Sequence, residues 1–416
     1  MRIPIKDVTP ETERAVVIGW INEVRDLGGL AFYILRDRTG FLQVTIVKKK
    51  APEAIIAAAK EASRESVVRV TGTIKAMEKA PGGRELIPET FEIISRAESP
   101  LPLDVSEKVP AEIDTRLDNR YLDARRPRVA AIFQIRSTVT NAINTLLFEE
   151  GFTNITTSKI VAAATEGGTE LFPLAYFEKE AFLNQSPQLY KQMMMAAGFE
   201  KVFEIAPIFR AEEHNTTRHL NEATSIDVEV SFADHHDMMD LLERVIVRAY
   251  TAVTESCGPA LEALGIELAI PKTPFPRISY GEAIDIAALS IDEEISYGDD
   301  LSTAAERSIG EEIGEHYFIT DWPTEIKPYY AMPYEDNPTV CKAFDLMHPR
   351  MELSSGAQRI HEHDLLVTQI TAKGLSPESF SFYLQPFRYG MPPHAGWGLG
   401  MDRLIMTMLG LQNIRE

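Results

Sequence analysis

Short stretches in which apolar and polar residues alternate fill most of the first hundred positions of the chain. Turn signals such as Gly28-Gly29 and Pro81-Gly82-Gly83 separate these stretches. Alternation of this kind predicts half-buried β-strands, here at 16–24, 32–36, 41–47, 67–75 and 86–94. An Ala-rich segment of helical character, 52–63, lies between the third and the fourth strand. The N-terminal part is therefore predicted to be a small β-module with one helix.

Five strands with a helix after the third are typical of an oligonucleotide-binding (OB) barrel, which we place at residues 1–97. In the third strand Leu42, Val44 and Ile46 point to one face, so the opposite face can contact a ligand. A ring for stacking and polar groups for hydrogen bonds suit single-stranded nucleic acid, and the candidates are Arg25, Phe32, Gln43 and Glu85. From this stretch alone, an equally good interpretation makes Phe32 a core residue and the polar side chains merely solvated.

A change in composition marks the end of this module. Residues 98–128 are rich in charge and punctuated by prolines, which predicts a hinge or linker followed by a docking segment. Between Ile132 and Leu147 apolar residues recur mostly every three or four positions, which predicts a helix that ends at Gly151. Its apolar stripe needs a partner, so we expect this helix to belong to a second, larger domain over residues 129–416.

Two alternating stretches in the centre of the chain, 202–210 and 225–232, predict an antiparallel hairpin. The predicted apolar faces of the two strands comprise Phe203, Ile205, Pro207, Phe209, Ile226, Val228, Val230 and Phe232. The opposite faces comprise Glu204, Arg210, Asp227, Glu229 and Ser231. We expect this second face to be exposed and to gather charge. The polar loop between the strands adds Arg218 and His219.

A second cationic position lies near the end of the chain. The segment from Trp397 to Arg403 opens an apolar helix and places Arg403 in its first turn. A helix start attracts anions, and an arginine strengthens that attraction. Arg403 could therefore surround a triphosphate together with the cations of the hairpin. The chain contains no Walker pattern and no Gly-x-Gly-x-x-Gly, so side chains would have to hold the nucleotide. Any one of these arginines, taken alone, is more often part of a surface ion pair.

Composition changes this picture in one respect. The net charge of −20 argues against a polyanionic partner, but the first hundred residues carry 16 basic and 14 acidic side chains, and the rest carries the acidic excess. Such segregation fits a small binding domain on a large acidic body, although a chance split explains it equally well.

The two cysteines, Cys257 and Cys341, exclude a disulfide framework and a Cys-rich zinc site. Apolar runs are far too short for a membrane span, and no secretory signal is recognisable, so a cytoplasmic location is expected.

The residues of the hairpin and of the last helix carry a family resemblance. Phe209-Arg-Ala-Glu212, the loop to Arg218-His219 and Gly398-Leu-Gly-Met-Asp-Arg403 resemble motifs 2 and 3 of class II aminoacyl-tRNA synthetases. The segments 165–170, 185–191 and 352–359 narrow the resemblance to archaeal-type aspartyl-tRNA synthetases. The similarity runs almost end to end. It implies an α+β protein with an OB barrel and a catalytic domain built on an antiparallel sheet flanked by helices.

The same resemblance implies an ATP-dependent ligase that makes aspartyl-adenylate and then esterifies the 3′ end of tRNA. Arg210 matches the catalytic arginine that bridges the α-phosphate and the aspartate carboxylate, and Glu212 matches the reader of the adenine amino group. The remaining ATP-binding positions that it implies are Arg218, His219, Leu220, Glu352, Gly400, Met401, Asp402 and Arg403. Oxygen ligands suit a hard cation, and the implied Mg²⁺ ligands are Asp345, Glu352 and Ser355. Spacing alone would more often make these acidic residues solvated.

Amino-acid selection also follows from the resemblance. Lys191 and Arg359 match the cations that bind the side-chain carboxylate of L-aspartate. Acceptors for its ammonium group match Asp227, Gln188 and Ser186. The remaining aspartate contacts are Arg210, Ser355 and Glu166, the last of which lies in a Gly-Gly loop that the family closes over the substrate. Asparagine would leave this cationic pocket uncompensated, so we expect its strong rejection.

Some positions depart from the family pattern. Ser158 replaces the motif 1 proline near the expected homodimer interface, Ala223 replaces the aromatic residue that stacks on adenine, and the chain stops where relatives continue. Strict relatives also carry a tryptophan at the place of Asn22 and a lysine in the turn before Glu85, where Lys79 and Pro81 are both candidates. We therefore expect charging of tRNA(Asp) and also of tRNA(Asn). The alternatives are a tRNA-binding paralogue without charging activity and an ammonia-dependent asparagine synthetase.

Overall fold

The structure is a computed structural model that describes residues 1–162, 171–212, 216–290 and 295–416. The chain divides into two compact units, Met1–Arg126 and Pro127–Glu416. Glu166 and its Gly-Gly loop lie outside the described residues. No helix among the described residues is long and apolar enough to cross a membrane.

The first unit is a closed five-stranded barrel with the strand order β1-β2-β3-β5-β4. Its elements are η1 (Ile5–Asp7), β1 (Arg14–Asp26), β2 (Leu30–Asp37), β3 (Gly40–Val47), α1 (Glu53–Glu61), β4 (Val67–Ala76), η2 (Pro81–Gly83) and β5 (Arg84–Ser95). All five predicted strands and the predicted helix are present. Leu42, Val44 and Ile46 are buried, as the alternation predicted. The predicted hinge segment contains two short helices, α2 (Ile113–Asp118) and α3 (Arg120–Asp123).

The base-reading candidates of the barrel divide into two groups. Phe32 is only half-buried and lies between the buried Ala31 and Tyr33, so it is not a core residue. Gln43 and Glu85 face each other across the parallel pair β3–β5, and Gln43 Nε2 donates to Glu85 Oε2 at 3.2 Å. Arg25 and Lys79 are exposed, and Arg25 pairs with Glu23. Phe32 and Gln43 are thus partly accessible, whereas Glu85 is buried and also accepts from the Thr45 hydroxyl at 2.5 Å.

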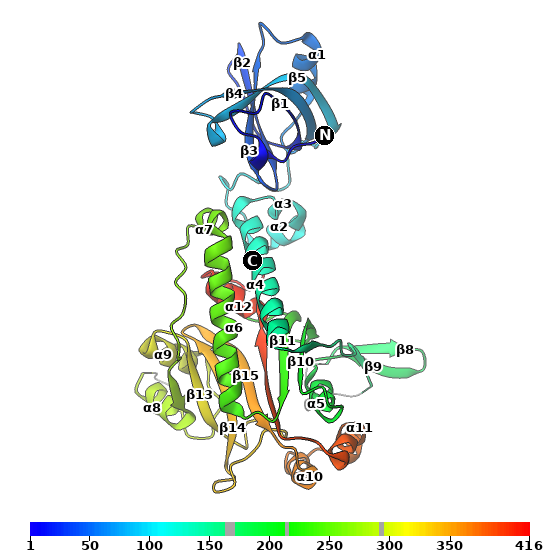
Figure 1. The fold of residues 1–416 in the computed structure, drawn as a ribbon, viewed down its shortest axis with the longest axis vertical. Coiled ribbons are helices and arrows are strands. Elements are labelled where there is room, and N and C mark those ends of the chain that lie inside the picture. The colour runs from blue at the N-terminus through cyan, green and yellow to red at the C-terminus, as the bar shows by residue number, and fades with distance from the viewer. Residues whose placement is uncertain (163–170, 213–215, 291–294) are drawn as a thin grey trace. The chain divides into compact units, whose positions relative to one another are not determined.

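The second unit is built on an eight-stranded sheet with the order β12-β13-β14-β15-β16-β11-β10-β6 (Figure 1). The pairs are antiparallel except β12–β13 and β10–β6. Its strands are β6 (Thr153–Asn154), β10 (Lys201–Phe209), β11 (Glu222–Ser231), β12 (Arg277–Ser279), β13 (Tyr317–Pro323), β14 (Val340–His348), β15 (Met351–Arg359) and β16 (His394–Gly400). A separate three-stranded sheet contains β7 (Ile160–Val161), β8 (Pro173–Tyr176) and β9 (Lys179–Leu183).

Two long helices, α4 (Pro127–Glu149) and α6 (His235–Ser256), run side by side along one face of this sheet (Figure 1). Their apolar stripes pack against Ile226, Val228 and Trp397 in the largest core. An Asp234 capping box starts α6. The remaining helical elements are α5 (Gln188–Ala196), α7 (Gly258–Leu264), α8 (Tyr280–Ser290), α9 (Thr303–Ile313), α10 (His363–Ala372), η3 (Pro377–Phe380), α11 (Ser381–Leu384), η4 (Gln385–Tyr389) and α12 (Met401–Met408).

The central hairpin forms as predicted, but its charged face does not lie where the pattern placed it. β10 and β11 pair antiparallel, with Phe203 opposite Val228. Glu204, Asp227, Glu229 and Ser231 are buried instead of exposed, because other parts of the chain cover this second face and supply partners. Thr157, for example, donates to Glu204 through its main-chain N at 2.8 Å and its hydroxyl at 2.7 Å.

Three local expectations were also wrong. Phe232 and Pro207 are exposed, although alternation assigned them to the apolar face. Phe232 follows the last residue of β11 and has a φ of 60°, so the chain has already left the strand. Residues 397–400 belong to β16, and the last helix begins only at Met401. The errors at Phe232 and at residues 397–400 reflect a change of backbone conformation that residue periodicity does not report, whereas Pro207 lies within β10 and is exposed there.

Candidate active site

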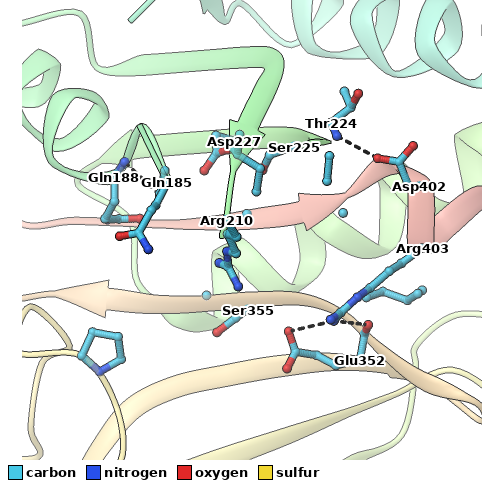
Figure 2. A pocket seen from close by; sticks show the side chains of 18 of the residues that line it. Gln185, Gln188, Arg210, Thr224, Ser225, Asp227, Glu352, Ser355, Asp402 and Arg403 are labelled. Atoms are coloured by element: carbon cyan, nitrogen blue, oxygen red, sulfur yellow. Dashed lines mark hydrogen bonds and ion pairs between the residues drawn. The ribbon is translucent and has the colours of Figure 1, made fainter. Parts of the chain in front are cut away.

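A pocket lies over the central strands of the second unit, between the end of β10, β11, β15, β16 and the start of α12 (Figure 2). Most predicted site residues line it: Ser186, Gln188, Arg210, Glu212, Arg218, His219, Leu220, Asp227, Glu352, Ser355, Arg359, Gly400, Asp402 and Arg403. Lys191, Asp345 and Met401 are buried side chains and do not line the pocket themselves. Residues from six sequence segments therefore converge on one site.

At one end of the pocket, two cations are almost fully buried. Lys191, on α5, lies 2.9 Å from Asp227 Oδ1 and donates to the main-chain oxygen of Trp397 at 2.9 Å. Arg359, at the end of β15, donates through Nε to Glu229 Oε1 at 3.0 Å. Glu229 is also 3.7 Å from Lys191, so one carboxylate holds both cations. Although burial by itself lowers the pKa of Arg359, Glu229 raises it above the ordinary value, and the guanidinium stays charged.

Glu229 is the main residue of this end to which the sequence analysis gave no function. Its position two residues after Asp227 on the same strand face was the available signal. Gly396, on the neighbouring strand, makes room for it, because a Cβ there would overlap the Glu229 carboxylate and the main chain of Val228. Gln188 also belongs to this end. Its Oε1 is 3.4 Å from Arg359, and its Nε2 is buried without a hydrogen-bond partner in the described part of the chain.

In the middle of the pocket, Arg210 follows the last residue of β10 and points into the cavity (Figure 2). Its main-chain N donates to Asn221 O at 2.9 Å, which closes the base of the loop that follows β10. Ser225 donates to Asp227 Oδ2 at 2.5 Å and so orients the carboxylate that Lys191 also contacts. The Arg210 guanidinium and the Asp227 carboxylate thus both face the cavity, and Asp227 connects it to the buried Lys191.

The other end gathers groups suited to phosphate. Arg403, in the first turn of α12, donates to the main-chain oxygen of Glu352 at 3.1 Å (Figure 2). Arg218 donates to the main-chain oxygen of Arg350 at 3.0 Å and lies 3.7 Å from Glu306. Burial, reinforced by the charge of Glu352, raises the pKa of Glu306 to about 7. His219 is exposed and bonds Thr216 Oγ1 at 2.8 Å. The sequence analysis did not single out Glu306.

Asp402 and Met401 have surroundings that limit what their side chains can do. Asp402 accepts from Arg136 of α4 at 2.5 Å and from the main-chain N of Thr224 at 2.7 Å. Its carboxylate therefore ties the start of α12 to β11 and α4. Met401 is fully buried in the core. Any contact of Met401 with a nucleotide would have to come from its main chain.

The predicted metal ligands lie on one strand pair. Asp345 on β14 is directly opposite Ser355 on β15, and Glu352 lies nearer the start of β15, opposite Met347. Burial raises the pKa of Asp345 to about 6, although Lys327 lies only 2.5 Å from Oδ2 and opposes the shift. The other oxygen, Oδ1, has no hydrogen-bond partner among the described residues. A buried, unpartnered carboxylate oxygen beside a hydroxyl and a second carboxylate is a donor set that fits Mg²⁺.

Comparison with known proteins agrees with this geometry. Residues 112–416 match the family described as tRNA synthetases class II (D, K and N), and residues 15–94 match the OB-fold nucleic acid binding domain. The "Aspartate--tRNA(Asp/Asn) ligase" of Methanoculleus marisnigri is 72% identical over 100% of this chain and 97% of that protein. The ligase of the same name from Archaeoglobus fulgidus is 62% identical, with the same coverage.

Solved structures show the same architecture. Asparaginyl-tRNA synthetase from Pyrococcus horikoshii, complexed with asparaginyl-adenylate, superposes with a TM-score of 0.93 at 33% identity, over 100% of this chain and 96% of that one. Aspartyl-tRNA synthetase from Entamoeba histolytica gives a TM-score of 0.88 at 30% identity, over 100% and 90% of the two chains. Both the fold and the matched residues lead to one conclusion: this chain is a class II aminoacyl-tRNA synthetase of the D, K and N group with an OB-fold anticodon-binding domain.

Proposed function

We propose that this enzyme is an aspartate–tRNA ligase that activates L-aspartate with ATP and charges both tRNA(Asp) and tRNA(Asn). The observation that carries the amino-acid assignment is the buried trio Lys191, Arg359 and Glu229. Two positive charges and one negative charge leave one positive charge, which a single substrate carboxylate balances. Asp227 already contacts Lys191 at 2.9 Å, so the substrate carboxylate would take its place at Lys191 and release Asp227 for the substrate ammonium. Fold likeness cannot make this choice, since solved relatives include both asparaginyl and aspartyl enzymes.

The residues suit a two-step reaction. First, a carboxylate oxygen of aspartate forms a bond to the α-phosphorus of ATP while the bond to the pyrophosphate oxygen breaks in line. Arg210, between the two ends of the pocket, neutralises the charge that grows on the α-phosphate. Then the terminal ribose hydroxyl of the tRNA attacks the activated carbonyl, and AMP leaves with the former carboxylate oxygen. Catalysis in both steps consists mostly of positioning and charge neutralisation.

Arg218, His219 and Arg403 are assigned to the far phosphates, and Glu212 to the adenine amino group. Mg²⁺ bound by Asp345, Glu352 and Ser355 would add positive charge next to the phosphates. Lys327, 2.5 Å from Asp345, adds a further cation to the wall of the pocket. The sequence analysis did not identify Lys327, because no charge pattern around it distinguishes it from a solvated lysine.

The proposal that tRNA(Asn) is also charged rests on the barrel. Asn22 lies at the irregularity of β1, between Ile21 and Glu23, where its Oδ1 accepts from Arg36 at 2.8 Å. A tryptophan there would add a stacking surface worth roughly 1 to 3 kcal/mol per base. The relatives named above carry "Asp/Asn" in their names. The tRNA contacts that we propose are Arg25, Phe32, Gln43, Lys79 and Glu85.

We further propose a cytoplasmic homodimer. Phe133 and Phe148 are exposed on α4, at 46% and 53%, and the short edge strand β6 follows that helix. Exposed rings on a long helix, and a sheet that ends at the short strand β6, suit a self-complementary interface. Light scattering of the purified protein would give the mass of two chains. The mass of one chain would contradict the proposal. It would then indicate that Ser158, in place of the motif 1 proline, weakens the expected interface.

Three assays test the function. Aspartate-dependent exchange of pyrophosphate into ATP separates an active ligase from a tRNA-binding paralogue, and the absence of free asparagine formation from ammonia excludes an asparagine synthetase. Neither alternative is favoured by the relatives, which are named as tRNA ligases. Purified tRNA(Asp) and tRNA(Asn) should then be charged side by side. A preference for tRNA(Asp) above about a hundredfold, or roughly 2.7 kcal/mol, would contradict the dual specificity.

A further inference from the structure

Two distant segments of the chain hold the loop that carries Arg218. The main-chain N of Ile414, close to the end of the chain, donates to the main-chain oxygen of Thr217 at 2.9 Å. Arg218 itself donates to the main-chain oxygen of Arg350 at 3.0 Å. The guanidinium of Arg350 in turn donates to the main-chain oxygen of Leu411 at 2.7 Å. Arg350 therefore connects the loop and the C-terminal segment, and the three hydrogen bonds form a closed circuit.

Contacts with neighbouring regular elements hold the main chain of Arg350 in place. It lies in the tight turn between β14 and β15, where its main-chain N donates to His348 Nδ1 at 3.1 Å. Helix α9 packs on this turn at Gly310 so closely that a Cβ there would overlap the main-chain oxygen of Pro349. The same helix carries Glu306, the carboxylate 3.7 Å from Arg218. The circuit is thus anchored on two regular elements of the domain, α9 and the β14–β15 hairpin.

The chemistry of these contacts leaves the charge of Arg218 available. A main-chain oxygen is neutral, so it fixes the direction of a guanidinium without cancelling its charge. The ion pair with Glu306 is longer than a hydrogen bond. Arg218 is also half-buried and lines the pocket. Such an arrangement preserves a directed positive charge for an anionic ligand, whereas a close carboxylate partner would compete with that ligand.

We propose that Arg350 is a positioning residue for ATP: through Leu411 and Ile414 it fixes the loop that directs Arg218 at the phosphates. The inference rests on the assignment of this end of the pocket to ATP in the proposed function. Arg350 does not touch the nucleotide in this proposal. Its effect reaches the substrate only through Arg218 and His219, so aspartate binding should be independent of it.

The decisive variant is Arg350→Met, which keeps an unbranched apolar stem but cannot donate to Leu411. We expect the Kd for ATP, measured by calorimetry in magnesium buffer, to rise about tenfold, as loss of a hydrogen bond that orients a charged group predicts. The KM for ATP in pyrophosphate exchange should rise in parallel, with the KM for aspartate unchanged. Arg350→Lys should restore most of the affinity, because an ammonium group can still donate to Leu411.

A matched control is Arg307→Ala, which removes an exposed arginine of α9 that pairs only with Glu311 among the described residues. It should leave ATP binding unchanged. Hydrogen exchange should show faster exchange of the Ile414 amide in Arg350→Met alone.

Unchanged ATP affinity in a folded Arg350→Met variant, or an equal loss of ATP and aspartate affinity, would overturn the inference. A wild-type protein that binds ATP but exchanges no pyrophosphate with aspartate would instead refute the proposed function. If Arg350→Met does not fold, an ATP affinity of Arg350→Lys below one tenth of wild type would also overturn it.

Discussion

The two ends of the pocket hold their cations in opposite ways. Lys191 and Arg359 are almost completely buried, and each is paired with a carboxylate. Arg218 and Arg403 are partly exposed, and their closest contacts are neutral main-chain oxygens. A buried charge without a charged partner is costly, whereas an arginine that faces solvent can be oriented by a neutral acceptor.

This difference suggests how each end meets its ligand. The amino-acid end is a pre-arranged network in which aspartate completes a charge balance. At the phosphate end, the closest contacts of Arg218 and Arg403 are neutral main-chain oxygens, so their positive charge stays available for a polyanionic ligand. The comparison predicts that substitutions of the cations at the first end affect both stability and specificity, and that substitutions of the cations at the second end act mainly on ATP.

The largest effect should follow from Arg359→Leu, which breaks the amino-acid end. The kcat/KM for aspartate in pyrophosphate exchange should fall by a factor that corresponds to about 3 kcal/mol or more. Truncating one partner of a buried charge pair costs about 2 to 5 kcal/mol. ATP affinity should persist, since Arg359 makes none of the contacts at the phosphate end. Near wild-type exchange with aspartate would show that the carboxylate of the substrate binds elsewhere.

Glu229→Gln tests whether one carboxylate organises both cations. Removing its charge leaves Lys191 and Arg359 close together, with Asp227 as the one carboxylate that pairs with either of them among the described residues. We expect the free energy of unfolding to drop by about 3 kcal/mol, as for other broken buried ion pairs. Added aspartate should then raise the melting temperature more in the variant than in the wild type, because its carboxylate replaces the missing charge. An equal shift in both proteins would contradict the charge balance argued above.

The sequence predicted the strands of this site well because alternation is a local property. β10 and β11 begin and end within a few residues of their predicted bounds, and their apolar side chains Phe203, Ile226 and Val228 are buried as expected. The sequence could not predict that the polar face is buried as well. Burial of Glu204 and Glu229 depends on elements that are distant in the sequence, such as Thr157 and Arg359.

The residues of the motifs were locatable from the sequence, but their partners were not. Asp402 was assigned to ATP, yet its carboxylate binds Arg136, a residue 266 positions away. Glu306 and Lys327 belong to the phosphate end through tertiary contacts only, and nothing near them in the sequence distinguishes them from solvated surface residues. The expected rejection of asparagine stays a prediction, but the sequence could not show that the carboxylates of Asp227 and Glu229 lie against its two cations.

Glu306→Gln probes the phosphate end through pH. The pKa of Glu306, about 7, lies above its ordinary value of 4.5, so the folded protein binds this proton more readily than the unfolded chain. The stability that protonation contributes is present below pH 4.5 and is lost as the pH rises through 7. The variant should therefore be more stable than wild type by about 2 kcal/mol above about pH 8, with the difference vanishing in acid. Thermal unfolding across this range, without nucleotide, measures the effect; equal pH profiles would contradict it.

The smallest effect is expected for His219→Ala, at an exposed position of the pocket. His219 is solvent-exposed and contacts Thr216 on its own loop, so no buried charge loses a partner when it is removed. We expect the KM for ATP to rise by a factor that corresponds to about 1 kcal/mol, as for one hydrogen bond to a phosphate, with stability and the KM for aspartate unchanged. Thr216→Val removes the hydroxyl that bonds His219 and should have a similar but weaker effect. If His219→Ala reduced ATP binding as severely as Arg359→Leu reduces aspartate activation, the contrast between buried cations held by carboxylates and partly exposed cations held by main-chain oxygens would be wrong, because an exposed residue would then carry as much binding energy as a buried one.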